Sequence, residues 1–328
     1  MTDSLLDIKN LTVSFTTDGG TLRAVENLSF SVGRGESVAL VGESGAGKSV
    51  SAMSVPRLVP SPPARVEQGE IFFKGRDVLK LPIRDMRAIR GKEIGVIFQD
   101  PTTALSPLHS IGWQLKEAIT LHGNLTDRDA TALAESWLSK VRIPDVKQRM
   151  DAYPFQLSGG MQQRVMIAMA LLHEPDLIIA DEPTTALDVT LQAQVFDLIK
   201  NMKRNDSSML LITHDMGVVY DICERVLVMY ASQLVEEGPT EDVFAHPAHP
   251  YTAGLLKSIP SLGEGRSKRL ESIKGQVPSP FNYPHGCRFS DRCPMAFERC
   301  SHEQPSFVNV SASHKASCFL LEEKGGKP

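Results

Sequence analysis

A membrane-spanning run and a secretory leader are both missing from this 328-residue sequence. The longest uninterrupted apolar run, residues 165–172, has eight residues, whereas a helix needs roughly 20 to cross a bilayer. The first four residues lack the basic and then apolar stretches of a signal peptide. We therefore expect a cytosolic chain, which can still dock on a membrane partner.

An excess of positive charge is also missing. Lys and Arg together number 35 and Asp and Glu number 39, which leaves a net charge of −4. This balance excludes a chain-wide basic surface, so we expect no nucleic-acid partner. Hydrophobic residues at 41% and charged residues at 23% are ordinary globular values, and they exclude wholesale disorder.

Cysteine is scarce and unevenly placed. The sequence has five cysteines, and four of them fall within residues 287–328. In a reducing cytosol such a cluster favours metal binding over disulfides. Its C-x5-C-x6-C-x17-C spacing matches neither the paired cysteines of zinc ribbons nor the ferredoxin runs. The surrounding sequence is rich in Gly, Pro and Ser after Pro260, which predicts a small loop-rich domain there.

Hydrophobic patterning predicts an α/β fold. Short continuous apolar runs are typical of buried parallel strands, and more alternating segments indicate antiparallel strands with one wetter face. Residues 126–141 show a helical pattern with Thr126 as the expected N-cap, inside an expected helical subdomain at about 100–160. The predicted buried strands are residues 37–41, 94–98, 177–180 and 209–213, the predicted antiparallel strands are 5–15 and 25–32, and a late hairpin is predicted at 226–230 and 233–235.

Residues 42–49, Gly-Glu-Ser-Gly-Ala-Gly-Lys-Ser, match the G-x-x-x-x-G-K-[ST] phosphate-binding P-loop. Its glycines let backbone amides point at an anion, and the following helix start adds positive charge. A predicted strand precedes the loop, as the motif requires. Lys48 is expected to reach the β- and γ-phosphates, and the Ser49 hydroxyl to bind Mg²⁺.

A second predicted strand ends in two acidic residues, Asp181 and Glu182. A carboxylate at this point is the Walker B arrangement that helps hold Mg²⁺. The neighbouring Glu182 can act as a general base toward water.

Residues 157–163, Leu-Ser-Gly-Gly-Met-Gln-Gln, form another expected anion-binding turn at a helix start. With this motif the sequence resembles the ATP-binding subunits of ABC transporters, whose signature motif is LSGGQ. Met161 stands where many members have Gln. The resemblance extends to Phe15 as the adenine-stacking aromatic, Gln99 as the Q-loop glutamine, residues 186–188 as the D-loop, and His214 as the switch histidine.

The resemblance implies a P-loop NTPase with an ABC-type ATPase core, an antiparallel β subdomain, a helical subdomain and a small Cys-rich C-terminal domain. Two such subunits are expected to close head to tail around ATP, with Ser158, Gly159 and Gly160 contacting the nucleotide bound to the other subunit. The implied catalytic residues are Glu182, His214 and Lys48. The implied ATP contacts are Phe15, Gly42, Ser44, Gly45, Gly47, Lys48, Ser49, Val50, Gln99, Asp181, Ser158, Gly159 and Gly160, and the Mg²⁺ ligands are Ser49, Gln99 and Asp181.

The last part of the chain limits the resemblance to one subfamily of these ATP-binding subunits. Residues 249–252, His-Pro-Tyr-Thr, and the cysteines that follow resemble the C-terminal region of oligopeptide, dipeptide and nickel importer ATPases, with the dipeptide D-type subunits most similar. The expected domains are residues 1–260 for ATP binding and 261–328 for this C-terminal region. Members of this subfamily imply a [4Fe–4S] cluster on Cys287, Cys293, Cys300 and Cys318, with zinc or no metal as the alternatives.

The expected function is ATP-driven import of di- and oligopeptides from the cytoplasmic face of the inner membrane. The implied partners are a homologous ATPase subunit, two transmembrane permeases and an extracytoplasmic substrate-binding protein. Import of nickel, opines, glutathione or other small solutes is an alternative. A soluble ABC protein of translation or DNA repair is a third hypothesis, which the single P-loop and the lack of heptad repeats disfavour.

Overall fold

The computed structural model describes residues 4–184, 189–258 and 273–324, which divide into two compact units. The P-loop unit comprises residues 4–32, 36–79 and the described residues from 212 onward. The helical unit comprises residues 33–35 and the described residues of 80–211. The domain boundary predicted at residue 260 lies outside the described residues.

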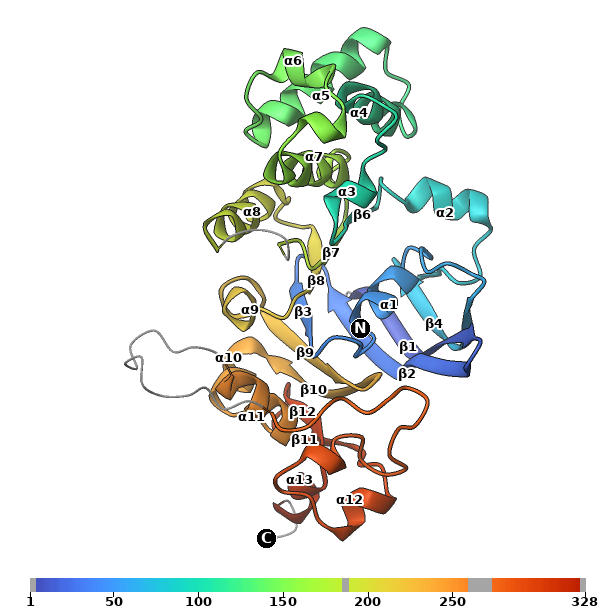
Figure 1. The fold of residues 1–328 in the computed structure, drawn as a ribbon, viewed down its shortest axis with the longest axis vertical. Coiled ribbons are helices and arrows are strands. Elements are labelled where there is room, and N and C mark those ends of the chain that lie inside the picture. Colours follow the sequence, from blue (N-terminus) through green and yellow to red (C-terminus); the bar gives the residue numbers. More distant parts are fainter. Residues whose placement is uncertain (1–3, 185–188, 259–272, 325–328) are drawn as a thin grey trace. The chain divides into compact units, whose positions relative to one another are not determined.

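A four-stranded sheet forms one layer of the P-loop unit. Its order is β2 (Gly20–Gly33), β1 (Ser4–Thr17), β4 (Ala64–Phe73) and β5 (Arg76–Asp77) (Figure 1). β1 runs antiparallel to β4, with Leu6 opposite Phe73. Alternation in the sequence predicts both early strands. It does not predict β4, because only three of the ten residues of that strand are buried.

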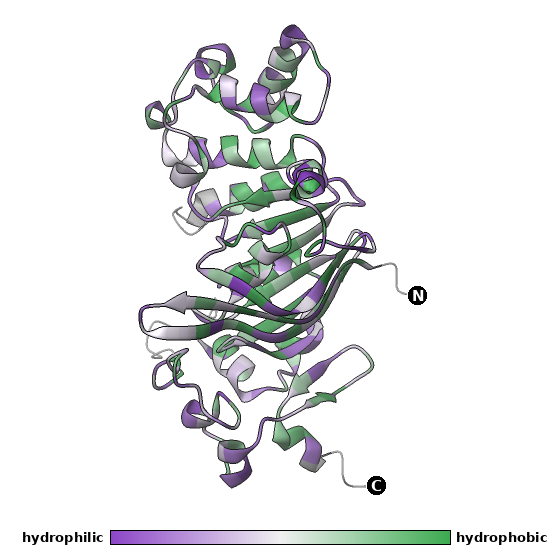
Figure 2. Cartoon of the chain, turned by 90° about the vertical axis from the view of Figure 1, so that its right-hand side faces the viewer, coloured by the Kyte–Doolittle hydropathy of each residue, from purple (hydrophilic) through white to green (hydrophobic). Residues whose placement is uncertain are grey.

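The P-loop unit also holds the strand order β11 (Phe307–Asn309), β12 (Lys315–Ser317), β10 (Gln233–Pro239), β9 (Arg225–Tyr230) and β3 (Ser37–Val41). β3 is parallel to β9, and β9 pairs antiparallel with β10, as predicted for the hairpin. All five residues of β3 are buried, and Figure 2 shows the hydrophobic character of the strands. The helices of this unit are α1 (Lys48–Ser54), α9 (Met216–Ile222), α10 (Thr240–Ala245), α11 (Pro250–Lys257), α12 (Glu298–His302) and α13 (Phe319–Lys324).

A buried carboxylate joins α11 and the C-terminal segment, residues 273–324, to β10. Glu236 is fully buried and accepts hydrogen bonds from the amides of Ala248 and His249 at 2.7 and 2.8 Å. His314 lies 2.7 Å from the same carboxylate through Nε2. Because a buried charge is costly unless it is hydrogen-bonded, this arrangement holds α11 and the β12 region on β10.

The helical unit contains β6 (Ile94–Ile97) and β7 (Leu177–Asp181) in parallel, with β8 (Ser208–Ile212) on the other side of β7. These strands confirm three predicted runs to within one or two residues. α7 packs so closely on β6 that a Cβ at Gly95 would lie 2.3 Å from the Ala170 carbonyl oxygen. The helices are α2 (Ile83–Ile89), α3 (Pro101–Ala104), α4 (Ile111–Thr120), α5 (Asp127–Lys140), α6 (Val146–Met150), α7 (Gly159–Leu171) and α8 (Val189–Met202).

Helix α5 confirms the predicted helix and its cap. The Thr126 hydroxyl accepts a hydrogen bond from the Asp129 amide at 3.2 Å, and Asp127 and Asp129 lie in the first turn. The buried face carries Ala130, Ala134, Trp137 and Leu138. In the described parts of the chain, no helix is both long and apolar enough to cross a membrane.

Candidate functional site

The P-loop follows β3 directly and begins α1. Gly42, Gly45 and Gly47 have φ values of 149°, 79° and 98°, which residues with a Cβ rarely adopt. A Cβ at position 42 would come within 2.1 Å of the Met229 carbonyl oxygen, and one at position 47 within 2.2 Å of the Ala24 carbonyl oxygen. The loop therefore lies tightly against β9 and β2, and only glycine fits at these two positions.

Lys48 is folded back over the loop. Its side chain is buried, and Nζ donates to the carbonyl oxygens of Gly42 at 2.8 Å and Glu43 at 3.0 Å. Ser44, Gly45 and Ser49 are exposed, and Val50 is half-buried in the first turn of α1. The loop thus presents accessible backbone and hydroxyl groups beside a cation, a donor set that fits a polyphosphate and its Mg²⁺.

Two further predicted residues belong to the P-loop unit. His214 is exposed between β8 and α9, just after the buried Thr213. Phe15 is half-buried in β1 opposite Ala64. Neither position excludes contact with a ligand.

The helical unit brings together Glu182 and Gln99. Glu182 follows Asp181 at the end of β7, and its Oε2 accepts a hydrogen bond from Gln99 Nε2 at 3.0 Å. Glu182 has a φ of 44°, an uncommon conformation for a residue with a side chain and one that is enriched at functional sites. Asp181 is buried. The amide of Gln99 therefore orients one of the two carboxylates at the end of this strand.

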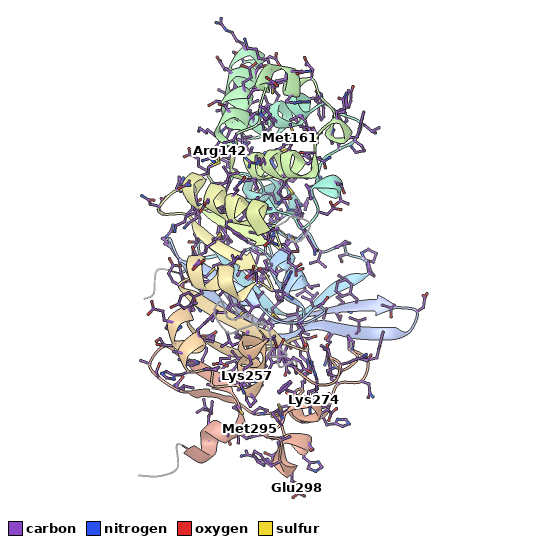
Figure 3. All side chains as sticks on the ribbon, turned by 60° about the vertical axis from the view of Figure 1, so that its left-hand side comes forward. Arg142, Met161, Lys257, Lys274, Met295 and Glu298 are labelled. Carbon is purple, nitrogen blue, oxygen red and sulfur yellow. The ribbon has the colours of Figure 1, made fainter. Side chains whose placement is uncertain are left out.

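The signature segment lies at the start of α7. Ser158 is the N-cap residue, and its hydroxyl accepts from the Met161 amide at 3.4 Å; Met161 is labelled in Figure 3. Ser158 and Gly159 are exposed, and Gly160 is half-buried. These exposed groups are available to a ligand on another molecule. The predicted D-loop at residues 186–188 lies outside the described residues.

Two glutamines of the same motif have structural roles that the sequence pattern does not predict. Gln162 donates from Nε2 to the carbonyl oxygens of Pro154 and Leu157, at 2.8 and 3.2 Å. Gln163 donates to the Pro183 carbonyl oxygen at 2.6 Å. Both side chains are buried. They hold the turn before α7 and connect α7 to the loop that carries Glu182.

The predicted site residues therefore form two groups. Gly42, Lys48, Ser49, Phe15 and His214 belong to the P-loop unit, and Gln99, Asp181, Glu182 and residues 158–160 belong to the helical unit.

The C-terminal segment reaches the P-loop, a contact that the sequence pattern does not predict. Arg292 donates to both carboxylate oxygens of Glu43, at 2.6 and 2.9 Å. The Glu43 amide donates to the Tyr251 hydroxyl at 2.8 Å. Hydrogen bonding to Glu43 raises the pKa of Arg292, and burial raises the pKa of Tyr251. Arg292 thus stays a cation, and the Tyr251 hydroxyl stays neutral.

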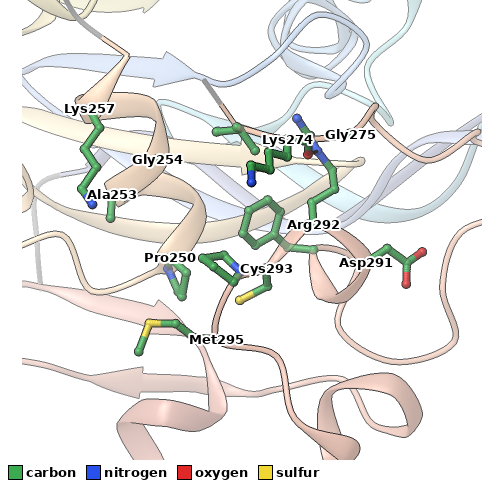
Figure 4. Close-up of a pocket in the computed structure, with 13 residues that line it drawn as sticks. Pro250, Ala253, Gly254, Lys257, Lys274, Gly275, Asp291, Arg292, Cys293 and Met295 are labelled. Carbon is green, nitrogen blue, oxygen red and sulfur yellow. Dashed lines mark hydrogen bonds between the residues drawn. The ribbon is translucent and has the colours of Figure 1, made fainter. Parts of the chain in front are cut away.

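Arg292 also forms part of the wall of a cavity of about 590 Å³ beside α11 (Figure 4). A smaller cavity, of about 20 Å³, is lined by all four C-terminal cysteines. Burial raises the pKa of the Cys287 thiol to about 11 and also raises the pKa of Cys293 and Cys318.

Comparisons with known proteins identify the family. A family model described as "ABC transporter" matches residues 25–185, and one described as "Oligopeptide/dipeptide transporter, C-terminal region" matches residues 235–300. The chain is 47% identical to the dipeptide transport ATP-binding protein DppD of Bacillus subtilis, over 98% of this chain and 96% of that protein. It is 44% identical to DppD of Haemophilus influenzae, over 99% of this chain and 98% of that protein.

The expected [4Fe–4S] cluster is wrong. The relatives are described only as dipeptide transport ATP-binding proteins, and within the described residues no group of three or more His, Cys, Asp or Glu side chains is arranged to hold a metal ion. The physical reason lies in the space among the cysteines. A cavity of about 20 Å³ holds about one water molecule, which leaves no room for a cluster of four iron and four sulfide ions.

A solved structure also resembles the chain. It is the dimeric post-hydrolysis state of the ATP-binding cassette MJ0796 bound to ADP and Pi, with a TM-score of 0.64 and 26% identity over 72% of this chain and 98% of that one. The α/β cassette fold with a P-loop is thereby confirmed. The chain belongs to the ABC transporter ATP-binding proteins of the oligopeptide/dipeptide transporter family and is an ATPase.

Proposed function

We propose that this chain is the ATP-hydrolysing subunit that powers import of di- and oligopeptides at the cytoplasmic face of the cell membrane. The observation that carries the proposal is identity of 44–47% over nearly the whole chain to dipeptide and oligopeptide transport ATP-binding proteins. The match to the oligopeptide/dipeptide C-terminal region supports it, because it lies outside the general ABC core. In this proposal residues 1–260 form the ATP-binding domain, with the helical subdomain at about 100–160, and 261–328 form a Cys-rich C-terminal domain.

The P-loop unit binds the nucleotide. Lys48 supplies a positive charge to the β- and γ-phosphates, and the loop amides surround them. Phe15 stacks on the adenine. Ser49, Gln99 and Asp181 would hold Mg²⁺, and the bound ion would neutralise charge on the phosphates. The remaining contacts are Gly42, Ser44, Gly45, Gly47 and Val50.

Hydrolysis is assigned to Glu182, with His214 contacting the γ-phosphate. Glu182 accepts a proton from the attacking water as a general base, and its hydrogen bond with Gln99 limits the orientations of the carboxylate. Catalysis by this arrangement rests mainly on positioning and charge stabilisation, as in other phosphoryl transfers.

A second ATPase subunit completes each site. Ser158, Gly159 and Gly160 contact the nucleotide held by that subunit, which we take to be a homologous rather than an identical chain. The dimeric state of the similar cassette MJ0796 supports the pairing of two ATPase subunits. The exposed start of α7 supports it too, since the groups at a helix N-terminus attract anions.

Two permeases dock on the helical unit and receive substrate from an extracytoplasmic binding protein. The support is an exposed apolar surface formed by Leu108, Trp113, Tyr153 and Phe155, with Leu108 at 80% and Phe155 at 73% exposure. The segments that carry these residues are adjacent, because the Ile111 amide donates to the Ala152 carbonyl oxygen. Exposed apolar surface of this kind marks an interaction site.

Phe155→Ser is expected to reduce co-purification of the permeases by about 30-fold, because an aromatic anchor at the centre of an interface contributes about 2 kcal/mol. Pull-down of the assembled transporter from membranes measures it. Tyr220→Ser is the matched control, since Tyr220 is an exposed aromatic of the P-loop unit. Equal loss for the two variants would contradict the docking surface.

Uptake in living cells tests the cargo. Cells that carry Glu182→Gln protein are expected to lose import of labelled di- and tripeptides and to keep import of labelled nickel, relative to wild type. Glu174→Gln is the control, because Glu174 is an exposed residue of the same unit. Loss of nickel uptake alone, or of neither, would contradict a peptide cargo and leave the ATPase assignment in place.

A further inference from the structure

We propose that Arg292 is a positioning residue for the P-loop, through which the C-terminal segment sets the affinity for ATP. The inference rests on the proposed role of the P-loop in binding phosphate. It goes beyond that role because Arg292 lies in the region matched by the oligopeptide/dipeptide C-terminal family model, outside the P-loop and the other nucleotide-binding motifs.

The first step is the contact itself. Arg292 and Glu43 are 249 positions apart and form a bidentate ion pair, in which Nη1 and Nη2 each donate to one carboxylate oxygen. The Arg292 side chain is 5% exposed and that of Glu43 29% exposed. Bidentate ion pairs between arginine and a carboxylate are strong and fix the relative orientation of both partners. The pair therefore restrains the second residue of the P-loop.

The second step is how Arg292 is held. Its Nε donates to the Lys274 carbonyl oxygen at 3.1 Å, and Nη1 donates to the Tyr230 hydroxyl at 3.2 Å. The guanidinium also lies 5.6 and 5.9 Å from the ring centroids of Tyr230 and Phe289. Figure 4 shows the side chain rising from the segment next to Cys293. All of its donor nitrogens are engaged, so the guanidinium has a defined position.

The third step is the packing that holds the segment carrying Arg292. The rings of Tyr230, Tyr251 and Phe289 contact one another, with centroids 4.6 to 5.4 Å apart. Phe289 is supplied by the C-terminal segment and is buried. Nearby, Arg288 donates to the Ala231 carbonyl oxygen and to the Glu26 carboxylate. The segment is thus packed on β9 and α11, and its position is transmitted to Arg292.

The last step connects Glu43 to the catalytic lysine. The carbonyl oxygen of Glu43 accepts a hydrogen bond from Lys48 Nζ at 3.0 Å, while its amide donates to Tyr251. Glu43 is therefore held by the C-terminal segment through its carboxylate, by α11 through its amide, and by Lys48 through its carbonyl. A shift of Glu43 displaces a hydrogen-bond partner of the lysine that binds phosphate.

Titration of the purified full-length chain with Mg·ATP tests the proposal. Arg292→Gln and Glu43→Gln are each expected to raise the Kd for ATP about tenfold, equivalent to about 1.4 kcal/mol. The double variant is expected to be no weaker than the weaker single variant, because the two residues act through one contact. Arg292→Lys keeps the positive charge without the bidentate contact, and its affinity for ATP is expected to lie between those of Arg292→Gln and the wild type.

Arg299→Gln is the matched control. Arg299 contacts Glu303 and Glu322 in the same segment and is 45% exposed. We expect its Kd to stay within about twofold of wild type, a change below about 0.5 kcal/mol. The proposal is overturned if Arg292→Gln also stays within twofold, or if Arg299→Gln weakens binding as much. If Arg292→Gln fails to fold, Glu43→Gln tests the same contact from its other side. Wild-type affinity for ATP in Lys48→Ala protein would contradict the P-loop assignment itself, which is a different outcome.

Discussion

Lys48→Ala is expected to weaken ATP binding about a hundredfold. Hydrogen bonds to charged groups contribute about 1.5–3 kcal/mol, and each 1.4 kcal/mol is a factor of ten. The substitution also removes the bonds from Nζ to the carbonyl oxygens of Gly42 and Glu43, so the loop loses a restraint as well as a cation. Titration with Mg·ATP on the purified chain measures the change.

Lys9→Ala provides the comparison for that measurement. Lys9 makes an exposed ion pair with Asp7, and such pairs contribute little. The Lys9→Ala protein should therefore bind ATP with the same affinity as the wild type. A Lys48→Ala protein that still bound ATP within about threefold of wild type would show that this lysine does not contact the phosphates.

Glu182→Gln is expected to reduce kcat for ATP hydrolysis by about 10²–10⁴-fold, the usual contribution of a general base. Glutamine keeps the size of the side chain and can still accept a hydrogen bond from Gln99, but it cannot take a proton from water. The affinity for ATP should therefore change little, and the closed dimer should accumulate. Steady-state phosphate release, combined with ATP titration and sedimentation, separates these effects.

The corresponding control is Glu174→Gln, an exposed carboxyl in the turn before β7, for which kcat should not change. Hydrolysis by Glu182→Gln at a near wild-type rate would contradict the general-base assignment. It would not affect the P-loop assignment, because Lys48 lies on a different strand-to-helix connection.

Polar and charged side chains, as well as apolar packing, hold the C-terminal segment against the rest of the P-loop unit. Arg288, Arg292 and His314 each reach an acidic residue of that unit: Glu26, Glu43 and Glu236. Of the three carboxylates, Glu236 is buried, whereas Glu26 and Glu43 are part-exposed. Removing a partner costs less at a part-exposed pair than at a buried one, because water can solvate the group that is left behind. The two hydrogen bonds from Arg292 to Glu43 are the contact through which we propose that this arginine influences the P-loop.

The local sequence pattern was sufficient to predict the buried strands and the capped helix α5. β3, β6, β7 and β8 are predictable because a continuous apolar run is needed wherever both faces of a strand are covered. Helix α5 is predictable because Thr126 and two early aspartates satisfy its first turn. The P-loop is also evident from sequence, since its glycines and lysine act within eight consecutive residues.

Other features depend on partners far away in the chain. β4 has few buried residues and exists because it pairs with β1. The prediction of a cluster site on the cysteines is wrong, because spacing alone does not reveal how little space lies between them.

By itself, then, the sequence determined the nucleotide-binding motifs and the buried strands, because these depend on neighbouring residues. Only the tertiary structure decided that Gln99 bonds to Glu182, that Gln163 holds the loop after β7, and that Arg292 reaches Glu43. The physical reason is that a hydrogen bond or ion pair between residues 20 to 249 positions apart leaves no periodic trace in the sequence. It forms only when packing brings the two groups within about 3 Å.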